Sequence, residues 1–553
     1  MKTHFIIKRF LLGLALLASC DFGAFAKVVL PVLVSDGMVL QRNAPLTIWG
    51  KADPSEKVCV KFQKKQYKVT ADENGKWAVT LPAMKAGGPY SMTINNIVLN
   101  DILVGDVFLC SGQSNMELPV NRVMDKYADE IEGYENTSVR YVKVPYSYDF
   151  SQQKEDIRPV TWRPMTTENV KDFSAICYFF SRLLEEKTNV PVGIINASWG
   201  GTPVEAWVSE KGLQNFPEYV HQKALYEDTK LVSRITETER LHQQAWNKVL
   251  YKSDAGLHGV TPWYAEDYDD SDWEKVDMFS DNWAIRNGRP LNGVHWFRKD
   301  FFVPEDWSGK EAVLRLGCIV DADSVFVNGH FVGTVSYQYP PRIYKVPSKL
   351  LKKGKNQLTV RLFSYGGRPS FVKEKPYKIL FGKGQPEKGE SEINLEGSWK
   401  YHLGAPMPAA PGQTAFHYKP TGLYNAMIAP LLNYTVSGVI WYQGESNVSR
   451  RNEYKDLLTA MISDWRQRWN KSDMPFYIIE LADFLSPTDK GGRTAWAEFR
   501  KAQAEVADTN KNVTLIKNSD LGEWNDIHPL DKKTLGQRVA AAILIEMNTK
   551  NRK

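Results

Sequence analysis

Ser114 is the first residue in the chain whose setting suits catalysis. It follows an apolar run at 102–109 that predicts a buried strand, and Gly112 breaks this strand just before the serine. A serine on a tight strand-to-helix turn projects its hydroxyl from the sheet, and the neighbouring backbone N–H groups can face a developing oxyanion. The Gly-x-Ser-x-Gly form of this turn is absent, because Asn115-Met116 follows the serine. This stretch alone fits a nucleophile and an ordinary Ser/Asn turn equally well.

A serine nucleophile needs a base, because a free hydroxyl barely ionises at neutral pH. The chain has 9 histidines, and only His528 stands in a polar segment beside an acid, between a predicted strand and a predicted helix. We therefore predict His528 as the base. Asp526 precedes it by two residues and points to the same side if the segment is extended. A Ser-His dyad that uses a backbone carbonyl in place of an acid is an alternative.

The segments around Ser114 and His528 alternate between predicted strands and predicted helices, and these elements must bring the two residues together. Apolar runs at 191–198, 436–440, 476–480 and 513–516 predict strands, and amphipathic stretches at 173–187, 454–469, 495–507 and 533–547 predict helices. This alternation predicts an α/β fold with three layers and a parallel sheet. Gly200 and Gly201 follow the strand at 191–198. They fit either a close backbone approach to a ligand or a tight turn.

Four motifs occur in a characteristic order along the chain. They are the turn around Ser114, Trp199-Gly200-Gly201-Thr202, Gln443-Gly444-Glu445-Ser446-Asn447 and Asp526-Ile527-His528-Pro529. This order resembles the SGNH-type hydrolases and, among them, the sialate O-acetylesterase family, which shares its hydrolase domain with some acetylxylan esterases. The resemblance covers roughly residues 104–215 and 415–548. It implies an SGNH-hydrolase-like parallel sheet and a serine esterase that needs no metal or cofactor.

The resemblance also implies roles for individual residues. The oxyanion would be held by the N–H groups of Ser114 and Gly201 and by a side-chain amide from Gln443 or Asn447, with Gln113 as a nearby alternative. Many SGNH enzymes place an aspartate three residues before the histidine, where this chain has Asn525. The acid therefore stays open between Asp526 and Glu445. The residues that we assign to substrate binding are Gln113, Gly200, Thr202 and Arg500.

The remaining segments predict further domains. Short strands and Asn-Gly or Gly-Gly-Pro turns at 27–103 predict an N-terminal β-sandwich. A polar stretch at 216–259 predicts a helical linker. Residues 260–405 resemble the galactose-binding-like jelly-roll domains of exo-acting glycosidases, and would be inserted within the hydrolase. This inserted domain could either bind sugar or shape the rim of the active site. We expect the insert to be separable from the core.

The first 26 residues predict a signal peptide. Lys2, Lys8 and Arg9 precede an apolar stretch that is too short to span a bilayer, and Ala24-Phe25-Ala26 suits cleavage before Lys27. Leu17-Ala18-Ser19-Cys20 is a competing lipobox, with Cys20 as the lipid anchor. The sequence thus predicts a periplasmic or extracellular protein of bacterial type, or a surface lipoprotein, that meets the membrane only through lipid.

Composition excludes several other classes of protein. The net charge of +6 is small for 553 residues, so nucleic-acid binding is not indicated. The cysteines after Cys20 lie far apart in apolar settings, which favours buried free thiols, and no metal-binding spacing occurs.

The function that we predict is a secreted esterase that removes O-acetyl groups from sialic acids through a serine acyl-enzyme. One alternative is the same chemistry on acetylated xylan or another hemicellulose. Another is a non-catalytic carbohydrate-binding protein.

Overall fold

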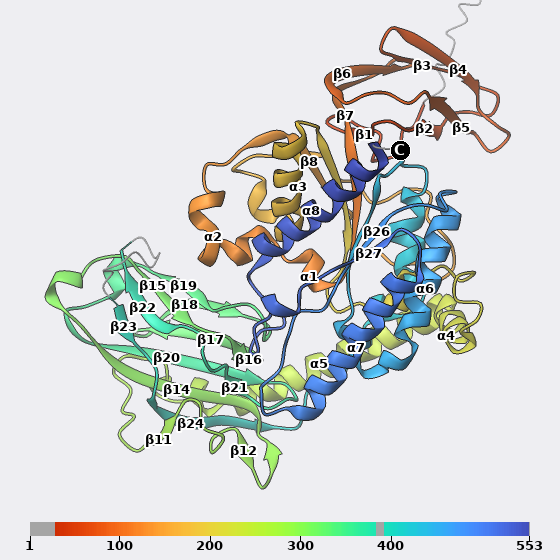
Figure 1. The fold of residues 1–553 in the computed structure, drawn as a ribbon. Helices are drawn as coiled ribbons and strands as arrows, with labels where there is room; N and C mark the ends of the chain where they lie inside the picture. Colours follow the sequence, from red (N-terminus) through yellow and green to blue (C-terminus); the bar gives the residue numbers. More distant parts are fainter. Residues whose placement is uncertain (1–27, 383–391, 552–553) are drawn as a thin grey trace, which may run out of the picture.

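A parallel sheet crosses the centre of the molecule, and β7 (Ile97–Gly112) is one of its inner strands (Figure 1). The computed structural model describes residues 28–382 and 392–551. The chain fills the sheet on one side of β7 first and then crosses to the other side. Ligands of α/β sheets bind at such a reversal of strand order, beyond the carboxyl ends of the strands. The parallel strands, in spatial order, are β27 (Val513–Ile516), β26 (Phe476–Ile479), β25 (Gly438–Tyr442), β7, β10 (Val192–Ser198) and β8 (Asn136–Lys143).

Helices lie on both sides of this sheet (Figure 1). On one side are α3 (Ala175–Thr188) and α8 (Lys532–Asn551), and on the other are α6 (Arg451–Arg468) and α7 (Lys490–Thr509). These are the four helices predicted from periodicity. The prediction started α7 five residues late, because its first turn is polar. Asp489 starts this helix by accepting a hydrogen bond from the N–H of Gly492 at 2.9 Å.

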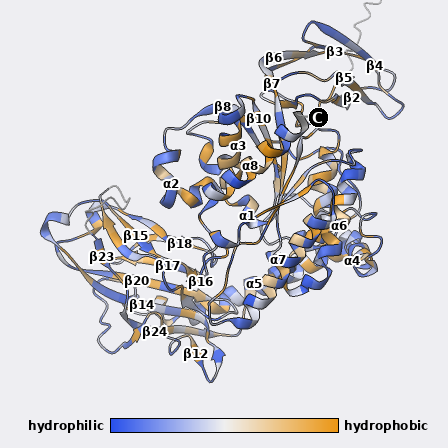
Figure 2. Cartoon of the chain, in the orientation of Figure 1, coloured by the Kyte–Doolittle hydropathy of each residue, from blue (hydrophilic) through white to orange (hydrophobic). Residues whose placement is uncertain are grey.

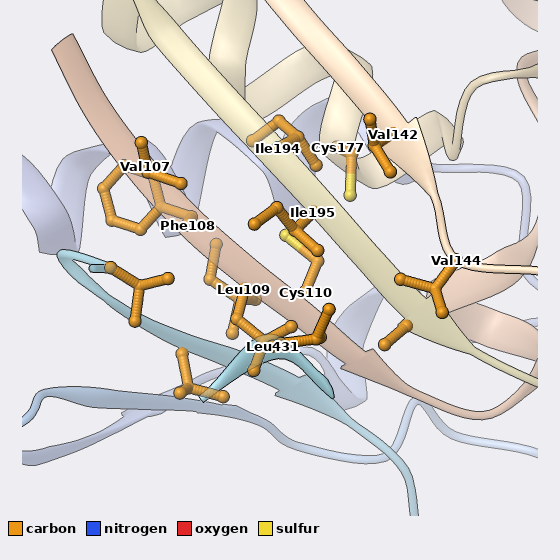
Figure 3. Close-up of a cluster of buried hydrophobic side chains, with 14 of the residues drawn as sticks. Val107, Phe108, Leu109, Cys110, Val142, Val144, Cys177, Ile194, Ile195 and Leu431 are labelled. Carbon is orange, nitrogen blue, oxygen red and sulfur yellow. The ribbon is translucent and has the colours of Figure 1, made fainter. Parts of the chain in front are cut away.

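The central strands are apolar on both faces because helices cover both faces. Every residue of β10 and β25 is buried. Figure 2 shows hydrophobic residues along the central strands and polar residues on much of the outer helix surface. Figure 3 shows Cys110 of β7 close to Ile195 of β10, and Cys177 of α3 near Ile194 and Val142. Both thiols are free and buried.

The N-terminal β region is joined to the α/β region through β7. Its strands include β1 (Val39–Gln41), which pairs with β7 in parallel, and β6 (Gly87–Ile94), which pairs with β7 in antiparallel fashion. The boundary predicted at 103/104 therefore falls inside one strand. One hydrophobic cluster runs through both regions. The other strands here are β2 (Leu46–Lys51), β3 (Lys57–Phe62), β4 (Lys65–Thr70) and β5 (Lys76–Leu81).

Two larger antiparallel sheets form most of the inserted domain, and a separate hydrophobic cluster lies between them. Two helices, α4 (Pro217–Glu227) and α5 (Thr229–Ser253), lead into it where the helical linker was predicted. The larger sheet has the order β11 (Glu274–Asp277), β24 (Ser398–Met407), β14 (Asn292–Val303), β20 (Gly354–Ser364), β17 (Ala322–Val327) and β18 (His330–Val335). The smaller has the order β19 (Ile343–Val346), β15 (Ala312–Leu316), β22 (Tyr377–Phe381) and β23 (Glu392–Asn394).

The predicted signal peptide, including Cys20, lies outside the described residues. Within the described ranges, every helix is too short or too polar to cross a membrane.

Candidate active site

The turn after β7 brings Ser114 to the carboxyl edge of the sheet. Gly112 has φ +139°, and a Cβ there would lie 2.0 Å from the carbonyl oxygen of Tyr442 in β25, so only glycine fits. The N–H of Gln113 donates to this same carbonyl at 3.0 Å. Helix α1 (Ser114–Glu117) begins directly at the serine, which is partly exposed. The turn therefore presents the hydroxyl of Ser114 beyond the end of the strand.

His528 meets Ser114 although 414 residues separate them in sequence. Its Nε2 lies 2.8 Å from the hydroxyl oxygen of Ser114. Burial lowers the pKa of His528 to about 3, and the nearby cations Lys532 and Arg122 add to this effect. The imidazole is consequently neutral at neutral pH, as a base must be if it is to take the serine proton.

Asp526 is the carboxylate beside this histidine. Its Oδ1 accepts a hydrogen bond from the backbone N–H of His528 at 2.9 Å and lies 3.9 Å from Nδ1 of the ring. That second distance exceeds a hydrogen bond, and the buried Nδ1 has no hydrogen-bond partner among the described residues. Catalytic hydrogen bonds are often long in a free enzyme and shorten when substrate binds.

Glu445 is directed at Asn115 rather than at the histidine. Its Oε1 accepts a hydrogen bond from Nδ2 of Asn115 at 2.6 Å, and this amide also donates to the carbonyl oxygen of Ile527 at 2.9 Å. Lys532 donates to Oδ1 of Asn115 at 2.7 Å. Burial raises the pKa of Glu445 and lowers that of Lys532 to about 8. This network joins the serine turn to the histidine segment through Asn115, whose part in the site the sequence analysis missed.

Gly201 follows Gly200, at which a Cβ would lie 3.5 Å from the Cβ of Ser114. Its φ is +75°, and a Cβ would lie 1.8 Å from the hydroxyl oxygen of Tyr418, so the position requires glycine. Its N–H donates to no other group in the part of the chain that the structure describes. The preceding N–H, of Gly200, is already taken by a carboxylate oxygen of Glu117 at 2.7 Å. Ser114 stands at the first helical position, where a backbone N–H has no acceptor within its own helix.

The motifs that this geometry unites also match a known family. A family model described as "carbohydrate esterase, sialic acid-specific acetylesterase" matches residues 104–251 and 404–545, which together are just over half of the chain. The chain belongs to this family. The predicted relationship to sialate O-acetylesterases is confirmed, and the matched segments leave out nearly all of the predicted insert.

Relatives of known name agree with this assignment. The sialate O-acetylesterase of Homo sapiens is 34% identical over 203 residues, which are 33% of this chain and 39% of the relative. That of Mus musculus is 32% identical over 206 residues, 33% of this chain and 37% of the relative. This esterase-family chain thus matches less than half the length of these relatives. A carbohydrate acetylesterase structure from Xanthomonas citri shares its mixed α/β fold, with a TM-score of 0.54 at 23% identity, covering 93% of this chain and 74% of that one.

Of the amides predicted for the oxyanion hole in this family member, two are already occupied. Nε2 of Gln443 donates to Oδ1 of Asn447 at 2.7 Å and to the carbonyl oxygen of Thr202 at 3.2 Å. Asn447 in turn donates to Glu205 at 3.0 Å, and both amides are fully buried. Gln113 differs. Its Oε1 accepts the N–H of Gly444 at 3.2 Å, whereas its Nε2 donates to no described group. Among the three, only Gln113 has an amide nitrogen that donates to no described group.

Two residues predicted to bind substrate make other contacts. The hydroxyl of Thr202 is buried and donates to the carbonyl oxygen of Trp199 at 2.7 Å. Arg500, on α7, pairs with Asp483 at 3.1 Å. The structure therefore does not bring either side chain to the Ser114–His528 pair.

The inserted domain of this esterase-family chain reaches the histidine segment. Lys375 lies 3.0 Å from Glu523 and 3.2 Å from Asp526. Burial lowers the pKa of Lys375, but these two acids outweigh it and the pKa is raised. The amide of Asn525 donates to the carbonyl oxygen of Lys373 at 2.8 Å. The ring of Tyr339 meets that of His528 edge-on, with ring centres 5.2 Å apart. No sequence motif marks Tyr339, Lys373 or Lys375, which lie far from the hydrolase motifs along the chain.

Proposed function

We propose that this protein is an exported serine esterase that removes O-acetyl groups from sialic acids. The observation that carries the proposal is the 2.8 Å contact between Ser114 Oγ and His528 Nε2, at the carboxyl edge of a parallel sheet. The order of the motifs supports an SGNH-type core. The family description and the names of the relatives support a sialic acid ester over an acetylated xylan.

Acylation would begin with attack by Ser114 Oγ on the acetyl carbonyl carbon. The serine proton passes to Nε2 of His528, and the negative charge on the carbonyl oxygen is met by the N–H groups of Ser114 and Gly201, with Nε2 of Gln113 as a third donor. The bond from the acetyl carbon to the sugar oxygen then breaks. His528 returns its proton to that oxygen, which leaves an acetyl-serine.

Deacylation would repeat these steps with water. His528 takes a proton from the water as its oxygen attacks the acetyl carbon, then gives a proton back to Ser114 as acetate departs. Asp526 is our choice for the acid that orients the ring, because it accepts the backbone N–H of His528 and its Oδ1 lies 3.9 Å from Nδ1. Oε1 of Glu445 instead accepts a hydrogen bond from Asn115. Glu445 would act through Asn115 as a positioning residue.

A direct test uses the chain without residues 1–26 and measures acetate released from p-nitrophenyl acetate, O-acetylated N-acetylneuraminic acid and acetylated xylo-oligosaccharides. We expect turnover of the sialic acid ester, and a loss of several orders of magnitude in Ser114→Ala with little change in melting temperature. Ser151→Ala is the matched control, because its hydroxyl bonds only to Asp149. Activity of Ser114→Ala within tenfold of the parent would remove Ser114 from the mechanism.

A further inference from the structure

Arg122 is a cation beside the site that the mechanism above does not use. It stands in the turn Val120–Val123, directly after the serine helix. It forms no ion pair with any carboxylate of the described residues, and its Nε is buried without a hydrogen-bond partner. Among the described residues, the one hydrogen bond of its side chain runs from Nη2 to the carbonyl oxygen of Tyr339, at 3.3 Å. A partly buried guanidinium without an anion is costly, so an anionic ligand would stabilise it.

The acids near Arg122 already have other partners. Asp125, one turn further along, pairs with Arg315 of the inserted domain, and Asp526 pairs with Lys375. Since none of these groups neutralises Arg122, its charge is available to a molecule that enters the site.

The chemistry places the sugar on the same side of the site as Arg122. His528 must return its proton to the sugar oxygen, so this oxygen has to lie within hydrogen-bond reach of Nε2. In the proposed mechanism the acetyl carbonyl oxygen instead faces the N–H of Gly201. Beside His528 stands the ring of Tyr339, with that of Tyr337 5.9 Å from it, and these two side chains are 37% and 52% exposed. Exposed aromatic rings offer apolar faces and edges against which a sugar ring can pack.

We propose that Arg122 binds a carboxylate of the substrate, and that Tyr339 and Tyr337 of the inserted domain pack against its sugar ring. Two parallel N–H donors of a guanidinium match the two oxygens of a carboxylate. The inserted domain thus completes a subsite for an acidic sugar, and Arg122 determines the preference for it. This inference rests on the proposed function, and assigns its specificity to residues outside the catalytic motifs.

The test compares O-acetylated N-acetylneuraminic acid with its methyl ester, in which a methyl group removes the negative charge of the carboxylate. Released acetate is the measured product. In the parent enzyme, kcat/KM should be ~10- to 100-fold higher for the acid, the range expected of a hydrogen-bonded ion pair. In Arg122→Gln this ratio should fall to about one, mainly through KM for the acid. Arg122→Lys should keep part of it. Arg234→Gln removes the same charge from an exposed position on α5 and should leave the ratio unchanged.

Each outcome decides a separate point. Suppose the parent enzyme cleaves the acid and its methyl ester equally well, or Arg122→Gln keeps the parent ratio. Either result overturns carboxylate binding by Arg122 but leaves the proposed esterase activity standing. A parent enzyme that cleaves p-nitrophenyl acetate but no acetylated sugar overturns both the proposed function and carboxylate binding by Arg122. If Arg122→Gln does not fold, the ratio measured for Arg122→Lys decides, because an unaltered ratio contradicts bidentate binding.

Discussion

Lys375 and Asp526 form an ion pair at 3.2 Å across the boundary between the inserted domain and the hydrolase core. The carboxylate of Asp526 therefore has two neighbours. One oxygen holds the backbone N–H of His528, and the other faces Lys375. The side chains of Lys375 and Asp526 are only 13% and 10% exposed, so solvent screens the pair weakly. The insert thus fixes the acid that stands nearest to the candidate base.

Replacing Lys375 should slow catalysis but leave substrate binding nearly unchanged, because we place Lys375 against Asp526 and not against the substrate. We expect Lys375→Met to lower kcat roughly tenfold to a hundredfold, less than the ~10⁴ lost when a triad acid is neutralised, because Asp526 and Glu523 lose their shared cation. Lys375→Arg should restore much of the rate. Steady-state kinetics with p-nitrophenyl acetate would measure this, with KM nearly unchanged. Lys378→Met, which breaks the pair with Glu392 at 2.6 Å, is the control. Equal rates in both methionine variants would show that the ion pair is unimportant.

The acid of the site can be identified by comparing Asp526→Asn with Glu445→Gln. We expect up to ~10⁴ loss of kcat in Asp526→Asn, since an amide neither orients the ring nor stabilises the imidazolium. Glu445→Gln should cost less, because its contact is to Asn115 and the buried carboxyl has a raised pKa. Single-turnover kinetics would separate the chemical step from product release. If Glu445→Gln is the more damaging change, the triad is Ser-His-Glu.

The pH dependence of kcat/KM reports the base of the free enzyme. A lowered pKa means that the folded protein disfavours protonation of His528, so its imidazole stays neutral as the pH falls below 6.5, the ordinary value. The acid limb for p-nitrophenyl acetate should consequently lie below about pH 5 rather than near the ordinary value. Arg122→Gln should move it upward by removing one nearby cation, and Arg234→Gln should not. An acid limb at or above the ordinary histidine pKa would contradict this account.

Deleting residues 255–405 should leave a folded but inactive core. The insert has hydrophobic clusters of its own, separate from the cluster that joins the N-terminal and α/β regions. Its removal nevertheless takes away Tyr339 and Lys375, and exposes Trp246 and Leu250 of α5, which pack on the insert. We would therefore add Trp246→Gln and Leu250→Gln, then record near-ultraviolet circular dichroism and esterase activity. Full activity would show that the insert is dispensable for catalysis. If the shortened chain only aggregates, the hydrophobic core of the hydrolase does not fold independently of the insert.

The sequence by itself was enough to predict the main helices and strands of the core and the candidate pair Ser114 and His528. Apolar periodicity is a local property, so the helices α3, α6, α7 and α8 and the strands around β7 were predictable. Ser114, Gly201 and His528 were identifiable because a turn after a strand, a glycine pair and a histidine beside an acid are each visible within a few residues. The start of α7 was missed, because a polar first turn carries no apolar signal and depends on the cap supplied by Asp489.

Only the tertiary structure decided which polar groups are free to act. Gln443, Asn447 and Gln113 are all amides near the site, and residue type cannot tell which of them already has partners. Contacts across more than 200 residues occupy the first two. Glu445 is taken by Asn115 in the same way, across 330 residues. Lys375 and Tyr339 lack any motif, since their place beside His528 arises from the docking of the inserted domain on the core. Arg122 follows the serine helix, but no sequence pattern marks it. A hydrogen-bond donor or a charge acts on substrate only where folding leaves it unsatisfied, and that depends on long-range contacts.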